Sequence, residues 1–207
     1  QIESYDTTTI RASVPMLLLS KYIKKNSKSK VILSGEGADE TSGSYMYFHN
    51  APNAEEFKKE TFRLIKDNRY FDILRADKTT AGAGLELRVP FYDKDFLNYY
   101  MSIDPKLKMV RHNYEKYLLR ITFEDLLPKE IAWRRKDGFS DGVSSFDKPW
   151  YSIIEEYTLS KYNLSELSYN KSIFDKYYRN YDNIIPYLWN HKWSKNLNNP
   201  SNRTINI

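Results

Sequence analysis

The chain has 207 residues and a formal net charge of +5, and 41% of its residues are hydrophobic and 15% aromatic. This length and composition suit one domain, or a large part of one, with a buried core. There is no cysteine, which excludes disulfides and thiolate metal sites, and no run of about 18 apolar residues, so we expect no membrane span. His49, His112 and His191 lie far apart without ligand spacing, which argues against a zinc site.

The sequence opens QIESYDTTTI, without a starting methionine and without a basic segment followed by an apolar one. Such a beginning lacks the design of a secretory signal. We therefore expect a fragment of a longer protein, and the absence of cysteine agrees with a cytoplasmic location.

The first expected element is a helix over residues 15–25, because Pro15 suits a first helical position and the basic residues near its end complement the helix dipole. The five lysines of residues 21–30 are interpreted as a helix end and a solvated loop, with a phosphate or nucleic-acid patch as the alternative. No nucleic-acid motif accompanies them, so we expect no nucleic-acid partner. The apolar run at 31–34 then predicts one buried strand of a parallel sheet.

A long helical segment is expected over residues 53–78, with Asn53 as its N-cap, and Gly82 and Gly84 break it. Its apolar positions on one face are Phe57, Leu64, Phe71 and Leu74.

Helices are also expected at 94–103 and 114–127, followed by a glycine loop over 129–143. After about residue 147 the chain is rich in Tyr and Asn and has no Gly, and we expect helices near 149–160 and 170–194 before a polar tail. The predicted fold class is α/β and mostly helical.

The seven glycines fall in three groups, each beside charged residues: Gly35, Gly37 and Gly43; Gly82 and Gly84; Gly138 and Gly142. If the three loops meet, they form a cleft with both signs of charge. Such a cleft suits a phosphate-bearing or zwitterionic substrate.

The segment SGEGADE, residues 34–40, follows the predicted strand, and ligands in open α/β sheets bind beyond the carboxyl ends of strands. It is neither a Walker loop nor a Rossmann fingerprint, and Glu36 would repel a phosphate. Glu36 therefore suits a base, a metal ligand or an ammonium binder. On spacing alone, Glu36, Asp39 and Glu40 are equally well explained as first-turn helix residues favoured by the dipole.

Several segments, in order, resemble the synthetase domain of glutamine-hydrolysing asparagine synthetases. They are YDTTTIRASVPM (5–16), SGEGADE followed by GxY (34–45), YFHNAPNAEEF (47–57), LRADKTTAGAGLELRVPFYD (74–93), EKYLLR (115–120) and LPKEIAWRRKDGFSDGV (127–143). The resemblance is good over roughly residues 1–145 and patchy afterwards, although NNPSNRTINI (198–207) also resembles the end of the family.

The resemblance implies a Rossmann-like parallel sheet of the adenine-nucleotide α-hydrolase type, as in ATP pyrophosphatases. It implies ATP and Mg²⁺, with ATP adenylating the side-chain carboxylate of aspartate and releasing pyrophosphate. Ammonia, delivered from an N-terminal glutaminase region, then displaces AMP. A homodimer is left open.

Carried over by position, Ser34, Gly35 and Gly37 form the loop that contacts the adenylate. Glu36 matches the carboxylate that holds ammonia and takes its proton, where it would stabilise the positive charge developing on nitrogen. Asp39 matches a residue on the magnesium or pyrophosphate side.

Asp72 matches an acidic residue that supports the catalytic basic groups; a surface salt bridge is its alternative. Lys136 matches the lysine that stabilises the phosphate charge, against the alternative of a solvated loop. Thr8 and Arg11 match residues near aspartate and the phosphates. Glu86 and Arg88 are expected to be structural partners that position the cleft loops.

Two features depart from the family pattern. Residues 41–45 read TSGSY where an apolar pair and Gly-Gly-Tyr are usual, which we expect to leave packing space at Ser42 and to cost backbone freedom at Ser44, and Asp137-Gly138 replaces Glu-Gln. No Ser-Gly-Gly-x-Asp-Ser pyrophosphate loop occurs in the sequence. We therefore expect residues 1–207 to be the C-terminal portion of a synthetase domain that does not bind ATP productively alone. The alternatives are a non-catalytic remnant or scaffold, and a β-lactam-forming synthetase of the same fold.

Overall fold

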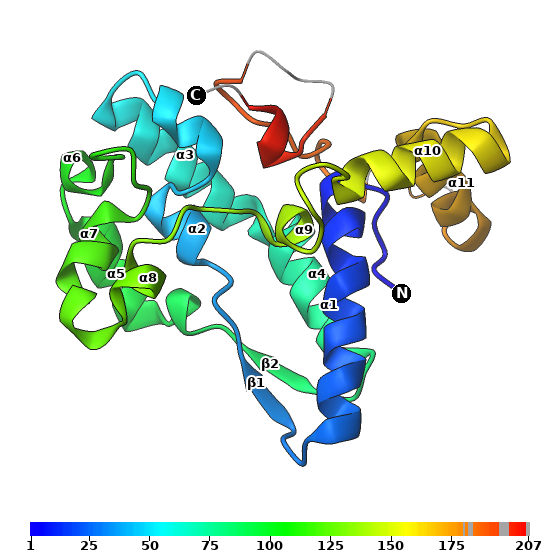
Figure 1. Cartoon of the computed structure of the whole chain (residues 1–207), viewed down its shortest axis with the longest axis horizontal. Helices are drawn as coiled ribbons and strands as arrows, with labels where there is room; N and C mark the ends of the chain where they lie inside the picture. Colours follow the sequence, from blue (N-terminus) through cyan, green and yellow to red (C-terminus); the bar gives the residue numbers. More distant parts are fainter. Residues whose placement is uncertain (180, 182–183, 195–198, 206–207) are drawn as a thin grey trace.

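A computed structural model of the chain describes residues 1–179, 181, 184–194 and 199–205 (Figure 1). It is mostly helical and carries one small parallel sheet, which agrees with the predicted α/β class. In Figure 1 α1 runs down the molecule to the small sheet at the bottom, with α4 beside it. Helices α3 and α5 to α8 lie to one side, and α10 and α11 extend to the other. No helix among these residues is long and apolar enough to cross a membrane.

Helix α1 (Thr7–Asn26) begins eight residues before the expected start. Asp6 is its N-cap, and its carboxylate accepts a hydrogen bond from the backbone of Thr9 at 2.8 Å. Pro15 therefore lies inside the helix, where it lacks the N–H that would bond the carbonyl of Arg11. The indole Nε1 of Trp150 donates to that carbonyl at 3.0 Å, so the group that proline leaves without its helical partner is satisfied by a distant segment.

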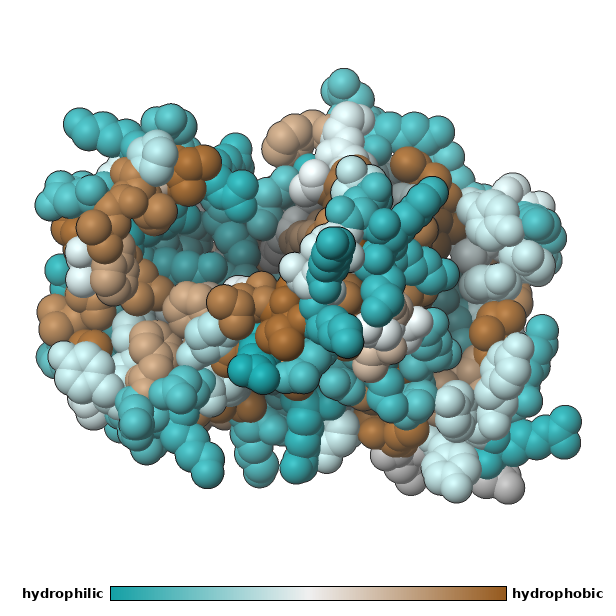
Figure 2. Space-filling model, turned by 90° about the horizontal axis from the view of Figure 1, so that it is seen from below, coloured by the Kyte–Doolittle hydropathy of each residue, from teal (hydrophilic) through white to brown (hydrophobic). Residues whose placement is uncertain are grey.

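The sheet consists of β1 (Val31–Leu33) and β2 (Glu86–Arg88), paired in parallel with Val31 opposite Glu86. The prediction of a strand at 31–34 is confirmed, but the prediction that it is buried is wrong, since Val31 is 41% and Leu33 71% exposed. The sequence prediction also missed β2, whose Glu86 and Arg88 pair with each other on an exposed surface. Figure 2 shows the molecule from below, and hydrophobic residues lie among polar ones on the surface seen there.

The segment expected as one helix over 53–78 is two helices, α3 (Ala54–Asp67) and α4 (Asp72–Ala81), separated by the 3-10 turn Asn68–Tyr70. The buried Asn68 causes the break, because its side-chain oxygen accepts from the backbone of Asp72 at 2.9 Å and of Ile73 at 3.2 Å. The Asn68 side chain thus accepts the hydrogen bonds that backbone carbonyls would accept in a continuous helix. Asp72 consequently stands in the first turn of α4.

The remaining helices are short near the middle of the chain and longer near its end. They are α2 (Ala38–Ser42), α5 (Lys94–Ser102), α6 (Pro105–Lys108), α7 (Tyr117–Thr122), α8 (Lys129–Ala132), α9 (Phe139–Gly142), α10 (Trp150–Tyr162) and α11 (Glu166–Tyr177).

Three sequence-based segments are corrected by these helices. The helix expected over 114–127 is confined to α7, with a 3-10 turn after it, and the expected glycine loop 129–143 contains α8 and α9. The helix expected over 170–194 lies at α11, and residues 184–194 are not helical. Part of the polar tail expected after 194 lies outside the described residues.

The hydrophobic core is aromatic and joins segments that are distant in sequence. Phe57, Leu64 and Phe71 pack there as their spacing predicted, whereas Leu74 is only half-buried. The other members are Tyr47, Phe48 and Trp189. Trp189 is fixed by its backbone N–H, which donates to Asp6 at 2.7 Å, so the core ties the end of the chain to the start of α1.

Candidate active site

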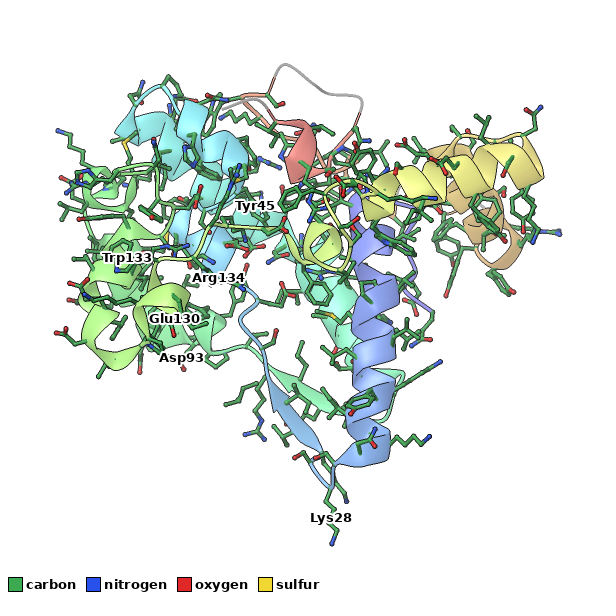
Figure 3. All side chains as sticks on the ribbon, in the orientation of Figure 1. Lys28, Tyr45, Asp93, Glu130, Trp133 and Arg134 are labelled. Atoms are coloured by element: carbon green, nitrogen blue, oxygen red, sulfur yellow. The ribbon has the colours of Figure 1, made fainter. Side chains whose placement is uncertain are left out.

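One cavity of about 450 Å³ opens at the carboxyl end of β1, between α1, α4 and the segment 134–140. This is where parallel α/β sheets place their ligands. It is lined by seven of the predicted site residues: Thr8, Ser34, Gly35, Glu36, Asp39, Asp72 and Lys136. Figure 3 places Tyr45 and Arg134, which also line it, near the centre of the molecule. Residues separated by more than 120 positions are thus brought to one site.

The expected meeting of three glycine loops is only partly correct. The first and third loops contribute Gly35 and Gly138 to the lining, but Gly82 and Gly84 do not. Gly84 lies instead beside the end of α1, where its carbonyl accepts from Lys24 at 3.2 Å. The residues on either side of the second loop that line the cavity are Thr80 at the end of α4 and Leu87 of β2.

Arg75, on α4, is a site residue that the sequence analysis did not name. Its Nη2 donates to Glu36 at 3.1 Å and to Asp72 at 2.7 Å. Its Nε and Nη1 are buried and have no hydrogen-bond partner among the described residues. Arg75 lines the cavity, so its positive charge is favourable for an anionic group bound there. The i, i+3 spacing of Asp72 and Arg75 was the available signal.

Glu36 combines burial with nearby charges of both signs. Burial raises the pKa of this carboxyl to about 7, Arg75 opposes the rise, and Asp72 and Asp39 add to it. A carboxyl with such a pKa can accept a proton near neutral pH. Its side chain is 16% exposed, so it remains open to the cavity.

Tyr45 links two carboxyl groups behind Glu36. Its hydroxyl lies 2.7 Å from Glu40 and 2.6 Å from Asp72. One hydroxyl proton can serve only one of them. Burial raises the pKa of Glu40, with Asp72 adding to the effect, which favours a protonated Glu40 that shares this bond with Tyr45 while Tyr45 donates to Asp72. The chain of bonds keeps Asp72 oriented toward Arg75.

Asp39 lies between two lysines from different segments. Lys136 Nζ is 2.6 Å from one carboxylate oxygen and Lys116 Nζ is 2.5 Å from the other. Burial disfavours the charge of Asp39, but the two lysines outweigh burial and lower its pKa. Asp39 in turn raises the pKa of Lys136 against the effect of burial.

This arrangement does not fit a protein-held Mg²⁺ at Asp39. Both of its oxygens face lysines, and no group of three acidic or histidine side chains in the described part of the chain could hold a metal. Mg²⁺ requires free oxygen ligands in octahedral geometry. No step below depends on a metal bound by these residues.

Thr8 and Gly37 lie in or beside the cavity in different ways. Thr8 lines the cavity, and its hydroxyl is buried without a partner among the described residues. Gly37 does not line the cavity. It has a φ of +93°, and a Cβ there would lie 2.6 Å from the ring of Tyr92, so glycine is required to begin α2.

Arg11 is placed apart from the cavity, which differs from the expected contact with aspartate and phosphates. It is 4% exposed, and its guanidinium binds Glu166 at 2.9 Å and 2.5 Å and Glu155 at 3.1 Å. These bonds join α1 to α10 and α11. Arg11 is therefore a structural residue in this arrangement.

The departure at Ser44 does not bring the expected cost in backbone freedom, whereas the hydroxyl of Ser42 is buried without a hydrogen-bond partner among the described residues. Both residues are fully buried, and Ser44 does not adopt a positive φ, so it does not need the freedom of glycine. The hydroxyl of Ser44 donates to Asp39. Gly43 between them has a φ of +56° and is retained.

Comparison with known proteins shows the family of the chain. The profile of the family described as asparagine synthase matches residues 1–63 and 51–201, so the chain belongs to this family. It is 46% identical, over 223 aligned residues, to the asparagine synthetase (glutamine-hydrolyzing) of Gallus gallus and 43% identical to that of Homo sapiens. Each alignment covers 99% of this chain and 40% of the relative, so the chain spans less than half the length of these proteins.

Proposed function

We propose that this chain is the C-terminal portion of the synthetase domain of an ATP-dependent asparagine synthetase, with a fold of the adenine-nucleotide α-hydrolase type. The observation that carries the proposal is the cavity at the end of β1. There Glu36 contacts Arg75, whose other nitrogens have no partner, and Lys136 stands nearby on the same wall. The identity to relatives named glutamine-hydrolyzing asparagine synthetases supports the same assignment.

In the proposed reaction, the side-chain carboxylate of aspartate attacks the α-phosphorus of ATP and pyrophosphate leaves. Lys136 and Arg75 supply positive charge for the phosphates and the acyl-adenylate, which is the electrostatic stabilisation that phosphoryl transfer needs. The small residues Ser34 and Gly35 let the backbone approach the nucleotide.

The second step makes the new carbon–nitrogen bond. Ammonia attacks the carbonyl carbon of the aspartyl-adenylate, its nitrogen becomes positive, and AMP leaves with the electrons of the C–O bond. The carboxylate of Glu36 stabilises the positive nitrogen and takes its proton. Asp72 holds Arg75 in place, and Tyr45 and Glu40 hold Asp72.

The nitrogen donor and the rest of the site belong to the same proposal. Ammonia would come from glutamine hydrolysed in an N-terminal region of the complete cytoplasmic protein. The loop that binds pyrophosphate would come from sequence before residue 1.

The test is the product of the complete protein, expressed from its whole coding sequence. With aspartate, ATP and glutamine we expect asparagine, AMP and pyrophosphate in equal amounts, detected by mass spectrometry and phosphorus NMR. Release of ADP and phosphate, or a β-lactam from an amino-acid panel with no asparagine, would assign a different synthetase. No turnover of ATP would indicate a non-catalytic scaffold.

A further inference from the structure

Lys116 contacts the candidate site without lining it. Its Nζ lies 2.5 Å from Asp39, but the cavity wall is formed by Asp39 and Lys136. It belongs to EKYLLR, residues 115–120, a segment that the proposed reaction does not use. Its side chain is 24% exposed, compared with 13% for Lys136.

The backbone of this segment is fixed on both sides of Lys116. Glu115 is buried and pairs with His49, and its carbonyl accepts from Arg120 Nε at 2.7 Å. Arg120 also donates to the carbonyl of Ala132 at the end of α8. Lys116 itself has φ 55° and ψ 28°, a left-handed conformation that is unfavourable for a residue with a side chain. Such a conformation persists only where surrounding contacts enforce it.

The charges explain what this placement does. Asp39 and Lys136 by themselves form a neutral pair, so the positive charge of Lys136 is balanced by Asp39. Lys116 on the other carboxylate oxygen makes the three-residue cluster net positive by one charge. Of the two lysines, Lys136 lines the cavity and Lys116 does not. The surplus charge is therefore available to an anion in the cavity.

We propose that Lys116 is a positioning residue that shares Asp39 with Lys136 and so leaves Lys136 able to bind the pyrophosphate portion of the nucleotide. The inference rests on the proposed function. It adds a residue outside the cavity that sets the strength of anion binding, acting through Asp39 rather than by touching substrate.

The experiment compares Lys116→Asn and Lys116→Arg in the complete protein. Asn tolerates the left-handed backbone and removes the charge, while Arg keeps the charge. Lys116→Gly, which relieves the backbone, is the second uncharged variant if the Asn variant does not fold. Lys94→Asn, at an exposed position of α5, is the matched control. The readouts are inhibition by added pyrophosphate, KM for ATP and KM for ammonia at fixed ionic strength.

We expect the inhibition constant of pyrophosphate and the KM for ATP to rise about tenfold in the uncharged variant, as loss of one nearby charge predicts. The KM for ammonia should stay within twofold, and Lys116→Arg and Lys94→Asn should match the wild type. Unchanged pyrophosphate inhibition in the uncharged variant, or equal weakening in Lys116→Arg, would overturn the inference. A structural role alone would lower kcat and leave the inhibition constant unaltered, which also overturns it.

If the wild type makes no asparagine, the proposed function fails. The role of Lys116 is then tested by calorimetric binding of pyrophosphate to the same proteins. Tenfold weaker binding in the uncharged variant alone supports it, and equal binding in all variants refutes it.

Discussion

Arg75 and Glu36 form a buried ion pair, with Arg75 Nη2 at 3.1 Å from Glu36 Oε1. The pair is incomplete, because Nε and Nη1 of the same guanidinium are buried without partners among the described residues. Arg75 therefore binds the candidate base and Asp72 through Nη2, and its positive charge lies in the cavity wall. The break between α3 and α4 creates this geometry, since it places Asp72 and Arg75 on the first turn of a new helix.

Loss of Arg75 should destabilise the chain and abolish catalysis. Arg75→Met leaves the partly buried carboxylates of Glu36 and Asp72 without a cation, and the cost should approach about 3–5 kcal/mol, the value typical of breaking a fully buried pair. Urea unfolding should show this loss at pH 8. Below pH 7 the loss should shrink, because protonated Glu36 needs no cation.

Arg69→Met, at an exposed position of the 3-10 turn before α4, is the control and should change the free energy of unfolding by less than about 1 kcal/mol. An Arg75 variant as stable as this control at pH 8 would contradict the buried pair.

The raised pKa of Glu36 predicts the pH dependence of asparagine formation. Glu36 accepts a proton only when ionised, so the rate with glutamine as donor should rise as pH increases through about 7. Asp72 contributes to raising this pKa. Asp72→Asn should therefore move the acid limb to lower pH by roughly one unit. Glutaminase rates measured on the same proteins serve as the control. An acid limb that does not move in Asp72→Asn would show that Asp72 does not affect the pKa of Glu36.

Gly43 should be far less tolerant of substitution than Gly35. Gly43 has a φ of +56°, and a Cβ there would collide with the ring of Phe57, whereas a Cβ at Gly35 would meet nothing within 4 Å. Gly43→Ala should lower the free energy of unfolding by about 2–4 kcal/mol, from backbone strain and overpacking. Gly35→Ala should lower it by less than about 0.5 kcal/mol. Similar values from urea unfolding would show that the loop yields to the added methyl group.

Arg11 offers a test of structural against substrate-binding roles. Arg11→Met should lower the free energy of unfolding by about 3–5 kcal/mol, since Glu166 stays buried without its partner. The double variant Arg11→Met/Glu166→Leu should recover much of that loss, because no buried charge is left unpaired. The KM for aspartate, measured where the variants are folded, should change less than twofold. A large rise in the KM for aspartate without a loss of stability would instead show that Arg11 is a substrate-binding residue.

The sequence predicted what depends on local pattern. The apolar run before SGEGADE indicated a strand followed by a site, and β1 ends at a cavity lined by Ser34, Gly35 and Glu36. Asn53 caps α3 as its position indicated, accepting from Glu56 at 2.9 Å. The period of Phe57, Leu64 and Phe71 was also a correct guide to the core.

What depends on distant contacts was not predictable. Asn68 has a good helical context on both sides, and only its bonds to the next turn end α3. Pro15 suggested a helix start, but the indole of Trp150, 135 positions later, makes an interior proline tolerable. Arg11 resembled a substrate ligand because nothing in the sequence connects it to Glu166. Arg75 was overlooked because its unpaired nitrogens become visible only in three dimensions.

The central claim is that Glu36 serves the nitrogen-transfer step of an asparagine synthetase. The most direct measurement separates the two steps in Glu36→Gln of the complete protein, by following exchange of labelled pyrophosphate into ATP together with asparagine formation. We predict aspartate-dependent exchange within about tenfold of the wild type and asparagine formation reduced by at least about 100-fold, as for loss of a general base. Asparagine formation at the wild-type rate in Glu36→Gln would contradict the claim.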